Sequence, residues 1–459
     1  MLGFDYGTSN CALGIMSGDK PELISLADHG TYMPSSLYAP SREVIVNWLQ
    51  QQLSPGAKAE FSGLRRFQLQ RGQSMLRELA LDDIPGDLFF GKQALERYLE
   101  DPSEGYYIKS PKSFLGASGL KPQQIALFED IVAAMMAHVK QLAEQALQQE
   151  LHQVVIGRPV NFQGLKGEES NKQAIDVLTN AAKRVGYRDI EFQFEPIAAG
   201  FEFEASLERE TRVLVVDIGG GTTDCSMQLM GPQLMPSLDR SVHLLGHSGQ
   251  RIGGNDFDIQ LALKGIMPQL GMDSLLKSGK PMPVNSYREA VAINNINAQT
   301  EFYSGANGRF LQQLKRDAEQ PELVEHLIQV HQEKLSYQLV NSAEQAKIAL
   351  SDNDSGKIAL DYLNNPANNP SGDKTADVSR LLLLDAAKRE LTSINELMQD
   401  TVKQAGCQPD AIFVTGGTAK SPVLRDHLQA QYPDSQFIIG DNFGSVTAGL
   451  TRWSQRIFA

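Results

Sequence analysis

Two short segments of the chain place an aspartate between an apolar strand pattern and a turn of glycine and hydroxyl residues. They read GFDYGTSN and VLVVDIGGGTTD, and their polar residues are Asp5, Gly7, Thr8, Ser9, Asp217, Gly219, Gly220, Gly221, Thr222 and Thr223. A turn of this kind points several backbone N–H groups the same way, which suits a phosphate oxygen. Because glycine has no Cβ, the backbone can also approach a bulky anion closely. Both segments are therefore predicted to bind phosphate.

The two aspartates predict a cation at the same place. A buried carboxylate is costly unless it is neutralised, and Mg²⁺ is typically held by one or two carboxylates together with substrate phosphates. The alternative is that each segment is an ordinary tight turn, since Asp and Gly are common turn residues. The pattern occurs twice, 212 residues apart from Asp5 to Asp217, and an apolar strand precedes each aspartate. This favours two facing phosphate loops on one nucleotide. No Walker-type phosphate loop occurs in the sequence.

The elements that must position these segments alternate between strands and helices. Residues 2–17 predict a β-hairpin. A helix follows in PQQIALFEDIVAAMMAHVKQLAEQALQQE and a strand in QVVIG. A second helix follows in GEESNKQAIDVLTNAAKRVGY and a second strand in IEFQFEP. A comparable series starts at RVLVVDIGG and ends with the helix LLLLDAAKRELTSINELMQDTVKQAG and the strand in CQPDAIFVTGG. We predict an α/β fold of two duplicated lobes around a cleft. The first spans residues 1–200, with a peripheral subdomain at about 34–110, and the second spans 201–459, with an inserted subdomain at about 257–355.

Composition narrows the function classes. The net charge of −13 argues against a nucleic-acid partner, and no apolar run is long enough to predict a membrane span. The N-terminus lacks the pattern of a secretory leader, and three scattered cysteines suit a reducing compartment, so a cytoplasmic location is expected. His243 and His247 have the i, i+4 spacing of helical zinc ligands, but the surrounding HLLGHSG predicts strand and loop, so they are interpreted as structural.

Seven motifs, in order along nearly the whole chain, resemble those of the DnaK-type heat-shock protein 70 family in the actin-like ATPase superfamily. They are FDYGTSNC, PKSFLG, FEPIAAG, VVDIGGGTTDCS, RIGGNDFD, EQAKIALS and VTGGTAKSP. The resemblance implies a duplicated actin-like (ribonuclease H-like) ATPase fold with a nucleotide cleft. It also implies ATP and ADP as ligands, Mg²⁺ as the metal, slow ATP hydrolysis and a role in the stress response.

The resemblance further implies roles for particular residues. Asp5 and Asp217 would hold Mg²⁺ through its waters. Lys112 would meet the γ-phosphate and the attacking water, although Lys109 is an alternative. Glu195, Asp224 and Thr222 would complete the catalytic set, but Glu195 could instead face solvent and Asp224 could cap a turn. The implied nucleotide-binding residues are Gly7, Thr8, Ser9, Gly219, Gly220, Gly221, Thr222, Gly254, Glu344, Lys347, Ser351, Gly416, Gly417, Thr418 and Lys420.

The sequence departs from the family pattern at several positions of the nucleoside side. Asn255 stands where a glutamate is usual, Ile348 and Lys420 stand where arginines are usual, and a Pro-Asp-Glu run is missing around Phe443. Loss of a planar guanidinium at position 348 predicts weaker stacking on a purine. The chain stops at Ala459, where family members continue into a peptide-binding domain, so we expect a short member without that domain.

Three functions follow from the resemblance. The first is a chaperone-like ATPase whose lobe closure is read by a protein partner or co-chaperone. The second is a filament-forming cytoskeletal ATPase, since DIGGGTT and the IGG-x-x-FD pattern also resemble that group. The third, a small-molecule kinase, has no sequence feature in its favour. The segment KSFLG and the length of the chain favour the first.

Overall fold

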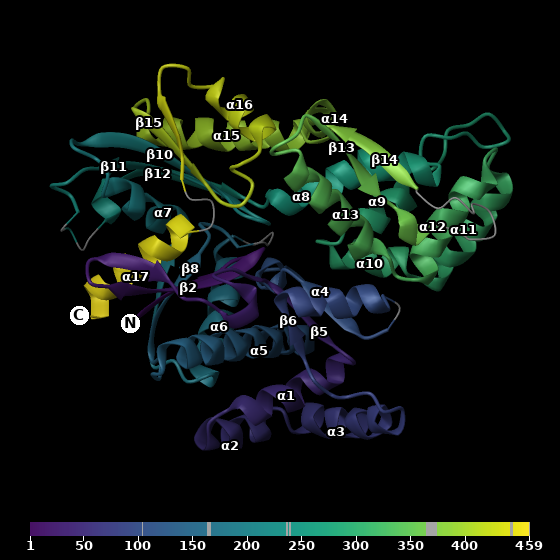
Figure 1. Cartoon of the computed structure of the whole chain (residues 1–459), viewed down its shortest axis with the longest axis horizontal. Helices are drawn as coiled ribbons and strands as arrows, with labels where there is room; N and C mark the ends of the chain where they lie inside the picture. Colours follow the sequence, from purple (N-terminus) through teal and green to yellow (C-terminus); the bar gives the residue numbers. More distant parts are fainter. Residues whose placement is uncertain are drawn as a thin grey trace.

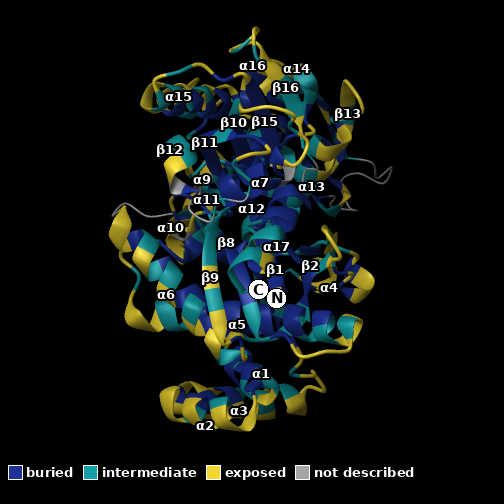
Figure 2. Cartoon of the chain, turned by 90° about the vertical axis from the view of Figure 1, so that its left-hand side faces the viewer, coloured by how far each residue is buried: buried dark blue, intermediate teal, exposed yellow. Residues whose placement is uncertain are grey.

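The computed structural model describes residues 1–102, 104–162, 167–235, 237, 240–363, 374–440 and 444–458. Two large sheets form the centres of two lobes, which lie one above the other in Figure 1. Buried residues are concentrated in these sheets and in the helices between them (Figure 2). The predicted α/β class and the duplicated plan are confirmed.

The sheet of the first lobe has the strand order β3-β2-β1-β8-β9. Its strands are β1 (Leu2–Tyr6), β2 (Asn10–Ser17), β3 (Lys20–Leu23), β8 (Gln153–Arg158) and β9 (Asp189–Phe194), with the short β4 (Met33–Pro34) beside β2. β1 pairs antiparallel with β2 and parallel with β8, as expected for a hairpin followed by a crossover. Leu2, Phe4 and Tyr6 alternate onto the face covered by the predicted helices α5 (Pro122–Leu147) and α6 (Glu168–Arg184).

The sheet of the second lobe repeats this arrangement in the order β12-β11-β10-β15-β16. Its strands are β10 (Thr211–Ile218), β11 (Thr223–Met230), β12 (Leu244–Gln250), β15 (Ala411–Thr415) and β16 (Gln436–Ile439). α15 (Lys388–Ala405) packs on β11 and β12, and α16 (Pro422–Gln429) follows β15. The prediction of a single helix at residues 381–406 is wrong in one respect. The structure divides this segment at Ala387 into α14 (Arg380–Ala386) and α15.

Two helices cross between the sheets and join the lobes. α7 (Glu195–Glu204) packs on β10 and β11, while α17 (Gly444–Phe458), which comes from the end of the described chain, packs on β1, β2 and β8 of the first lobe. Their crossing is tight, since a Cβ at Gly449 would lie 1.8 Å from the carbonyl oxygen of Ala198. A Cβ at Gly3 would similarly lie 2.4 Å from the backbone nitrogen of Thr451. Small residues therefore set the distance between the two lobes.

Each lobe also carries a peripheral unit. In the first lobe, the sheet β6-β5-β7 (β5 Ser36–Ala39, β6 Phe89–Phe90, β7 Tyr106–Lys109) lies beside α4 (Gly91–Glu100) and the helices α1 (Ile45–Gln52), α2 (Pro55–Leu64) and α3 (Arg66–Leu81). The insertion of the second lobe is mostly helical, as predicted: α8 (Gly254–Leu261), α9 (Asn285–Val291), α10 (Ile296–Phe302), α11 (Gly305–Asp317), α12 (Pro321–Gln332) and α13 (Ser336–Ala349). The hairpin of β13 (Ser355–Ala359) and β14 (Thr375–Ser379) follows it. His243 ends a short 3-10 turn and His247 lies in β12, which confirms the prediction of strand and loop there.

Candidate functional site

The two predicted phosphate loops are closed by the same kind of backbone hydrogen bond. In the β1–β2 hairpin the N–H of Gly7 donates to the carbonyl of Asn10 at 3.0 Å, and in the β10–β11 hairpin the N–H of Gly219 donates to the carbonyl of Thr222 at 2.9 Å. Each glycine lies two residues after its aspartate, so the match between the sequence patterns extends to the turn conformation. The part of the chain that the structure describes offers no backbone carbonyl to the N–H groups of the residues between, namely Thr8, Ser9, Gly220 and Gly221.

The two turns face each other across the lobes. A Cβ at Gly220 would lie 1.9 Å from Oγ of Ser9, and a Cβ at Gly221 would lie 2.9 Å from Cγ2 of Thr8. Any larger side chain would push the turns apart. The glycines of the second turn therefore allow the two sets of N–H groups to approach one small ligand from opposite sides.

A cavity of about 270 Å³ lies where the turns meet. Both lobes line it, and most of its lining was predicted from the sequence. The predicted residues in contact with the cavity are Asp5, Gly7, Thr8, Ser9, Glu195, Asp217, Gly219, Gly220, Thr222, Gly254, Glu344, Lys347, Gly416, Gly417 and Thr418. Of the other predicted residues, Lys112, Gly221, Asp224, Ser351 and Lys420 do not line it.

Four carboxylates and one lysine form a buried group beside the cavity. Asp217 and Asp224 are opposite each other in the β10–β11 ladder, Asp5 comes from β1 just before the first turn, and Glu195 comes from the start of α7. Lys112, in the 3-10 turn Pro111–Phe114, donates from Nζ to Oε1 of Glu195 at 2.5 Å. Glu195 is only 8% exposed and Asp224 only 1%, so Glu195 does not face solvent. Asp224 accepts a hydrogen bond of 2.7 Å from the backbone N–H of Val160 in the first lobe.

The carboxylates outnumber the cation, and the pKa values reflect this imbalance. Burial, and then the charge of Glu195, raises the pKa of Asp5 to about 7 although Lys112 opposes the rise. The same two causes raise the pKa of Asp224 to about 8, and they raise the pKa of Asp217 well above its ordinary value. Burial alone would lower the pKa of Lys112, but Glu195 and Asp5 outweigh it and raise the pKa. A carboxyl group with a raised pKa favours its neutral form unless a positive charge is near, so these carboxyl groups are suited to a cation-binding site.

These residues fit magnesium held through water. Among the described residues, no three His, Cys, Asp or Glu side chains are grouped so that they could coordinate a metal ion directly. Mg²⁺ keeps several of its waters and needs only one or two carboxylates plus phosphate oxygens, so a spaced pair such as Asp5 and Asp217 suits it. The buried hydroxyl of Thr415, which is opposite Asp217 in the sheet, has no hydrogen-bond partner in the described part of the chain and is available to a water there.

The two candidate lysines have different partners. Lys109 does not reach the carboxylate group; its Nζ donates to Oε2 of Glu344 in α13 at 2.5 Å, which joins the two lobes. Lys112 alone is buried against Glu195. Burial would lower the pKa of Lys109, but Glu344 overcomes this and raises it.

The residues that the resemblance assigns to the nucleoside form the other end of the cavity. Lys347 donates to the carbonyl of Gly254 at 3.1 Å and pairs with Asp258 at 2.7 Å. A Cβ at Gly254 would lie 2.7 Å from Oγ1 of Thr418, so only glycine fits between α8 and the turn after β15. Ile348 lines the cavity and is 54% exposed, which leaves an open apolar surface where an arginine was expected.

The remaining positions in and around the cavity fall in three groups. Lys420 is exposed, and Ser351 lies past the end of α13, where its N–H donates to the carbonyl of Ile348. Phe443 lies outside the described residues. Asn10 and Asp258 line the cavity although the sequence reasoning did not select them. Asn10 ends the first turn and Asp258 lies inside the motif RIGGNDFD, so attention to every polar residue of the motifs would have found both.

The two duplicated sheets, the crossing helices α7 and α17, and the shared cavity together define the actin-like ATPase fold. Comparison with known proteins agrees with this class. The family model described as "Hsp70 protein" matches residues 118–266. The chain is 24% identical to "Chaperone protein dnaK1" of Prochlorococcus marinus and 23% identical to "Chaperone protein DnaK" of another strain of that species. Both alignments cover 98% of the present chain. It is 23% identical to "Chaperone protein dnaK3" of a Synechocystis strain over 93% of its length.

The chain is therefore similar to proteins of the Hsp70 family. It spans about half the length of the curated relatives it matches, with 55%, 59% and 44% of those three proteins covered. Within the described residues, no helix is both long enough and apolar enough to cross a membrane.

Proposed function

We propose that the protein binds one Mg-ATP between its lobes and hydrolyses it slowly. The observation that carries the proposal is the pair of matching turns, with Gly220 against Ser9, beside a buried group of four carboxylates and Lys112. The four N–H groups and the hydroxyls of Thr8 and Ser9 would bind phosphate oxygens. Asp5 and Asp217 would hold Mg²⁺ through water, and the metal would supply positive charge that neutralises the phosphates and these carboxylates.

Lys112, Glu195 and Asp224 would act on the water that attacks the γ-phosphate. Glu195 holds the ammonium of Lys112 in place, so that the ammonium can donate to the developing negative charge. The carboxylates of Glu195 and Asp224 would orient the water, and Thr222 would support the phosphate from the second turn. Phosphoryl transfer depends mainly on such positioning and charge stabilisation.

The output of the reaction would be a change in the angle between the lobes. The turns can only be this close when the lobes are closed, so a ligand that joins them favours the closed arrangement. The names of the relatives, which are chaperone proteins, support a chaperone-like switch that is read by a protein partner or co-chaperone. A cytoplasmic location and the division near residue 200 remain part of this proposal.

The first test is calorimetric titration with ATP, with and without magnesium. We expect one site that needs magnesium, and we expect the double variant Asp5→Asn, Asp217→Asn to lose the magnesium dependence. The variant Asp19→Asn, which changes an exposed aspartate of the β2–β3 turn, serves as the control. Normal Mg-ATP binding by the double variant would contradict the proposal.

The second test distinguishes the possible outputs. Small-angle scattering with and without ATP measures lobe closure, and pelleting measures filament formation. A monomer that becomes more compact with ATP supports the chaperone-like switch. ATP-dependent pelleting would instead support the cytoskeletal alternative, and no change in either measurement would contradict both.

A further inference from the structure

The helical hairpin α2–α3 is a feature that the nucleotide site does not use. In Figure 1 it lies at the far end of the first lobe, with α5 between it and the sheet. It takes no part in lining the cavity between the lobes. Its face away from α5 consists largely of exposed residues (Figure 2).

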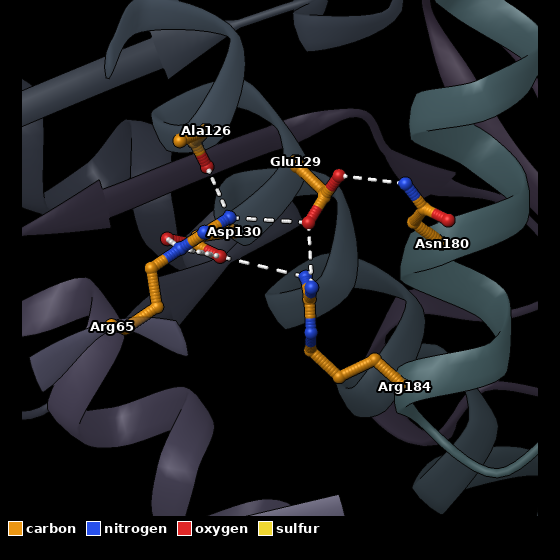
Figure 3. A network of polar contacts seen from close by, with 6 residues as sticks. All are labelled: Arg65, Ala126, Glu129, Asp130, Asn180 and Arg184. Atoms are coloured by element: carbon orange, nitrogen blue, oxygen red, sulfur yellow. Dashed lines mark hydrogen bonds and ion pairs between the residues drawn. The ribbon is translucent and has the colours of Figure 1, made fainter. Parts of the chain in front are cut away.

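A buried network of ion pairs fastens the hairpin to the lobe (Figure 3). Arg65, at the joint between the two helices, donates from Nε to Oδ2 of Asp130 at 2.9 Å and from Nη2 to Oε1 of Glu129 at 3.1 Å. Arg184 of α6 donates to the same Glu129 oxygen at 2.6 Å, and Asn180 donates to the other oxygen at 3.1 Å. The side chains of Arg65 and Asp130 are only 8% and 5% exposed. Such a network needs good geometry to offset desolvation, so it holds the joint in one position.

Close backbone packing fixes α3 as well. A Cβ at Gly72 would lie 2.4 Å from the carbonyl oxygen of Glu43 and 1.8 Å from Oδ1 of Asn47, so the helix lies directly on α1 and the turn before it. Leu69 and Phe61 are buried in the core of the lobe. The hairpin is therefore a rigid platform with an outward face.

Two grooves open on either side of Arg65, and each has an exposed apolar side chain at its edge. The Phe67 groove has a volume of about 310 Å³. Apolar residues that include Ile45, Val46, Phe67, Ala126 and Leu127 line it together with polar and charged residues that include Arg71, Glu43 and Asp130. The Leu64 groove has a volume of about 550 Å³. Apolar residues that include Ala57, Phe61, Leu64, Pro122 and Ile125 line it together with charged residues that include Lys183, Arg184, Glu60 and Glu129. Phe67 is 78% exposed and Leu64 is 56% exposed. Aromatic and aliphatic side chains beside grooves are typical anchors for a partner.

The charge of the hairpin is opposite to that of the chain. Within residues 55–81, the exposed charges are four basic residues and two acidic ones, a net of +2, whereas the whole chain carries −13. The basic residues are Lys58, Arg66, Arg71 and Arg77, and the acidic residues are Glu60 and Glu78. A locally basic segment on an acidic protein favours an acidic partner, and the net negative charge of each copy disfavours a second copy of the same chain.

We propose that the face of α2–α3 around Phe67 and Leu64 is a docking surface for an acidic amphipathic helical segment of a partner protein. Apolar side chains of that segment enter the two grooves, and its carboxylates lie against the exposed Arg66 and against Arg71, whose Nη2 is also 3.6 Å from Oε1 of Glu43. The concave grooves favour a peptide with protruding side chains over a flat lipid surface. This inference rests on the hairpin alone and is independent of ATP binding.

The test uses the full chain and three fluorescein-labelled peptides of 18 residues. The first has Leu and Phe at helical spacing and Glu or Asp elsewhere, the second is a shuffled version, and the third has Lys in place of each acid. Fluorescence anisotropy should show that the first peptide binds at least about tenfold more tightly than the other two, and more weakly at high salt. Phe67→Glu should weaken its binding at least about tenfold. The matched control is Leu381→Glu, at a leucine of α14 that is also 78% exposed. This control should leave the affinity for the first peptide unchanged.

Specific outcomes would overturn the proposal. They are equal binding of the acidic and shuffled peptides, no binding of any peptide, or unchanged affinity in Phe67→Glu. Cosedimentation with vesicles of phosphatidylcholine and phosphatidylglycerol, and sedimentation equilibrium of the free protein, test the other occupants. Phe67-dependent vesicle binding or dimerisation without peptide binding would replace the partner segment with a membrane or a second copy. Thermal unfolding and ATP turnover show whether the Phe67→Glu variant is folded.

Discussion

Replacing Asp224 by asparagine is expected to stabilise the nucleotide-free protein at alkaline pH. The carboxylate is 1% exposed and lies with three other acids beside the single buried ammonium of Lys112. Burial and Glu195 raise its pKa from 3.8 to about 8. Asparagine keeps the size of the side chain and an oxygen that can accept from the N–H of Val160, but it removes the charge.

The size and the sign of this stability change follow from the linkage between proton binding and folding. Between pH 3.8 and about 8 the native state holds a proton that the unfolded state has released, so the free energy of unfolding falls as pH rises through this range. A rise of about four pKa units corresponds to about 6 kcal/mol of cost to the folded state above pH 8. Burying the uncharged amide costs about 1–3 kcal/mol, so we expect the variant to be more stable than the parent by about 3–5 kcal/mol near pH 9. The gain should shrink toward zero near pH 5.

Urea unfolding of the nucleotide-free protein at several pH values between about 5 and 9 measures this difference. Asp176→Asn, at an exposed aspartate of α6, is the matched control and should change the stability little at any pH. The reasoning is refuted if Asp224→Asn is no more stable than the parent near pH 9. It is equally refuted if the gain is the same at both ends of the pH range, because a gain that is independent of pH does not arise from the charge.

Three further predictions concern the cleft. Lys112→Met should retain ATP binding and lower single-turnover hydrolysis by about 100- to 1000-fold, while Lys109→Met should leave the chemical step intact; loss in Lys109→Met alone would reverse these roles. Gly220→Ala adds a Cβ that would lie 1.9 Å from Oγ of Ser9, so small-angle scattering should show no ATP-dependent compaction of the protein. Normal compaction of this variant would mean that the two turns need not meet. Ile348→Arg places a guanidinium at the exposed edge of the cavity and should raise ATP affinity about fivefold by calorimetry, for roughly 1 kcal/mol of stacking; unchanged affinity would place the purine elsewhere.

The sequence was sufficient for features that depend on residues close together in the chain. The apolar strand patterns of β1 and β10 and the Asp-Gly turns after them are local, and each turn is closed by a hydrogen bond between residues three apart. The apolar spacing of α5 and α6 is local in the same way. The division of the helix at Ala387 was missed because helical residues continue on both sides of it.

The tertiary structure decided which distant residues are partners. Lys109 and Lys112 are three residues apart with similar neighbours, yet one pairs with Glu344 and the other with Glu195, because β7 and the following 3-10 turn direct them to different lobes. Likewise, α17 packs on the first sheet, although its sequence follows the second. The raised pKa values of the carboxylates also exist only where burial and neighbouring charge act together. Local spacing determines the elements and the turns, whereas partner choice and burial depend on the path of the whole chain.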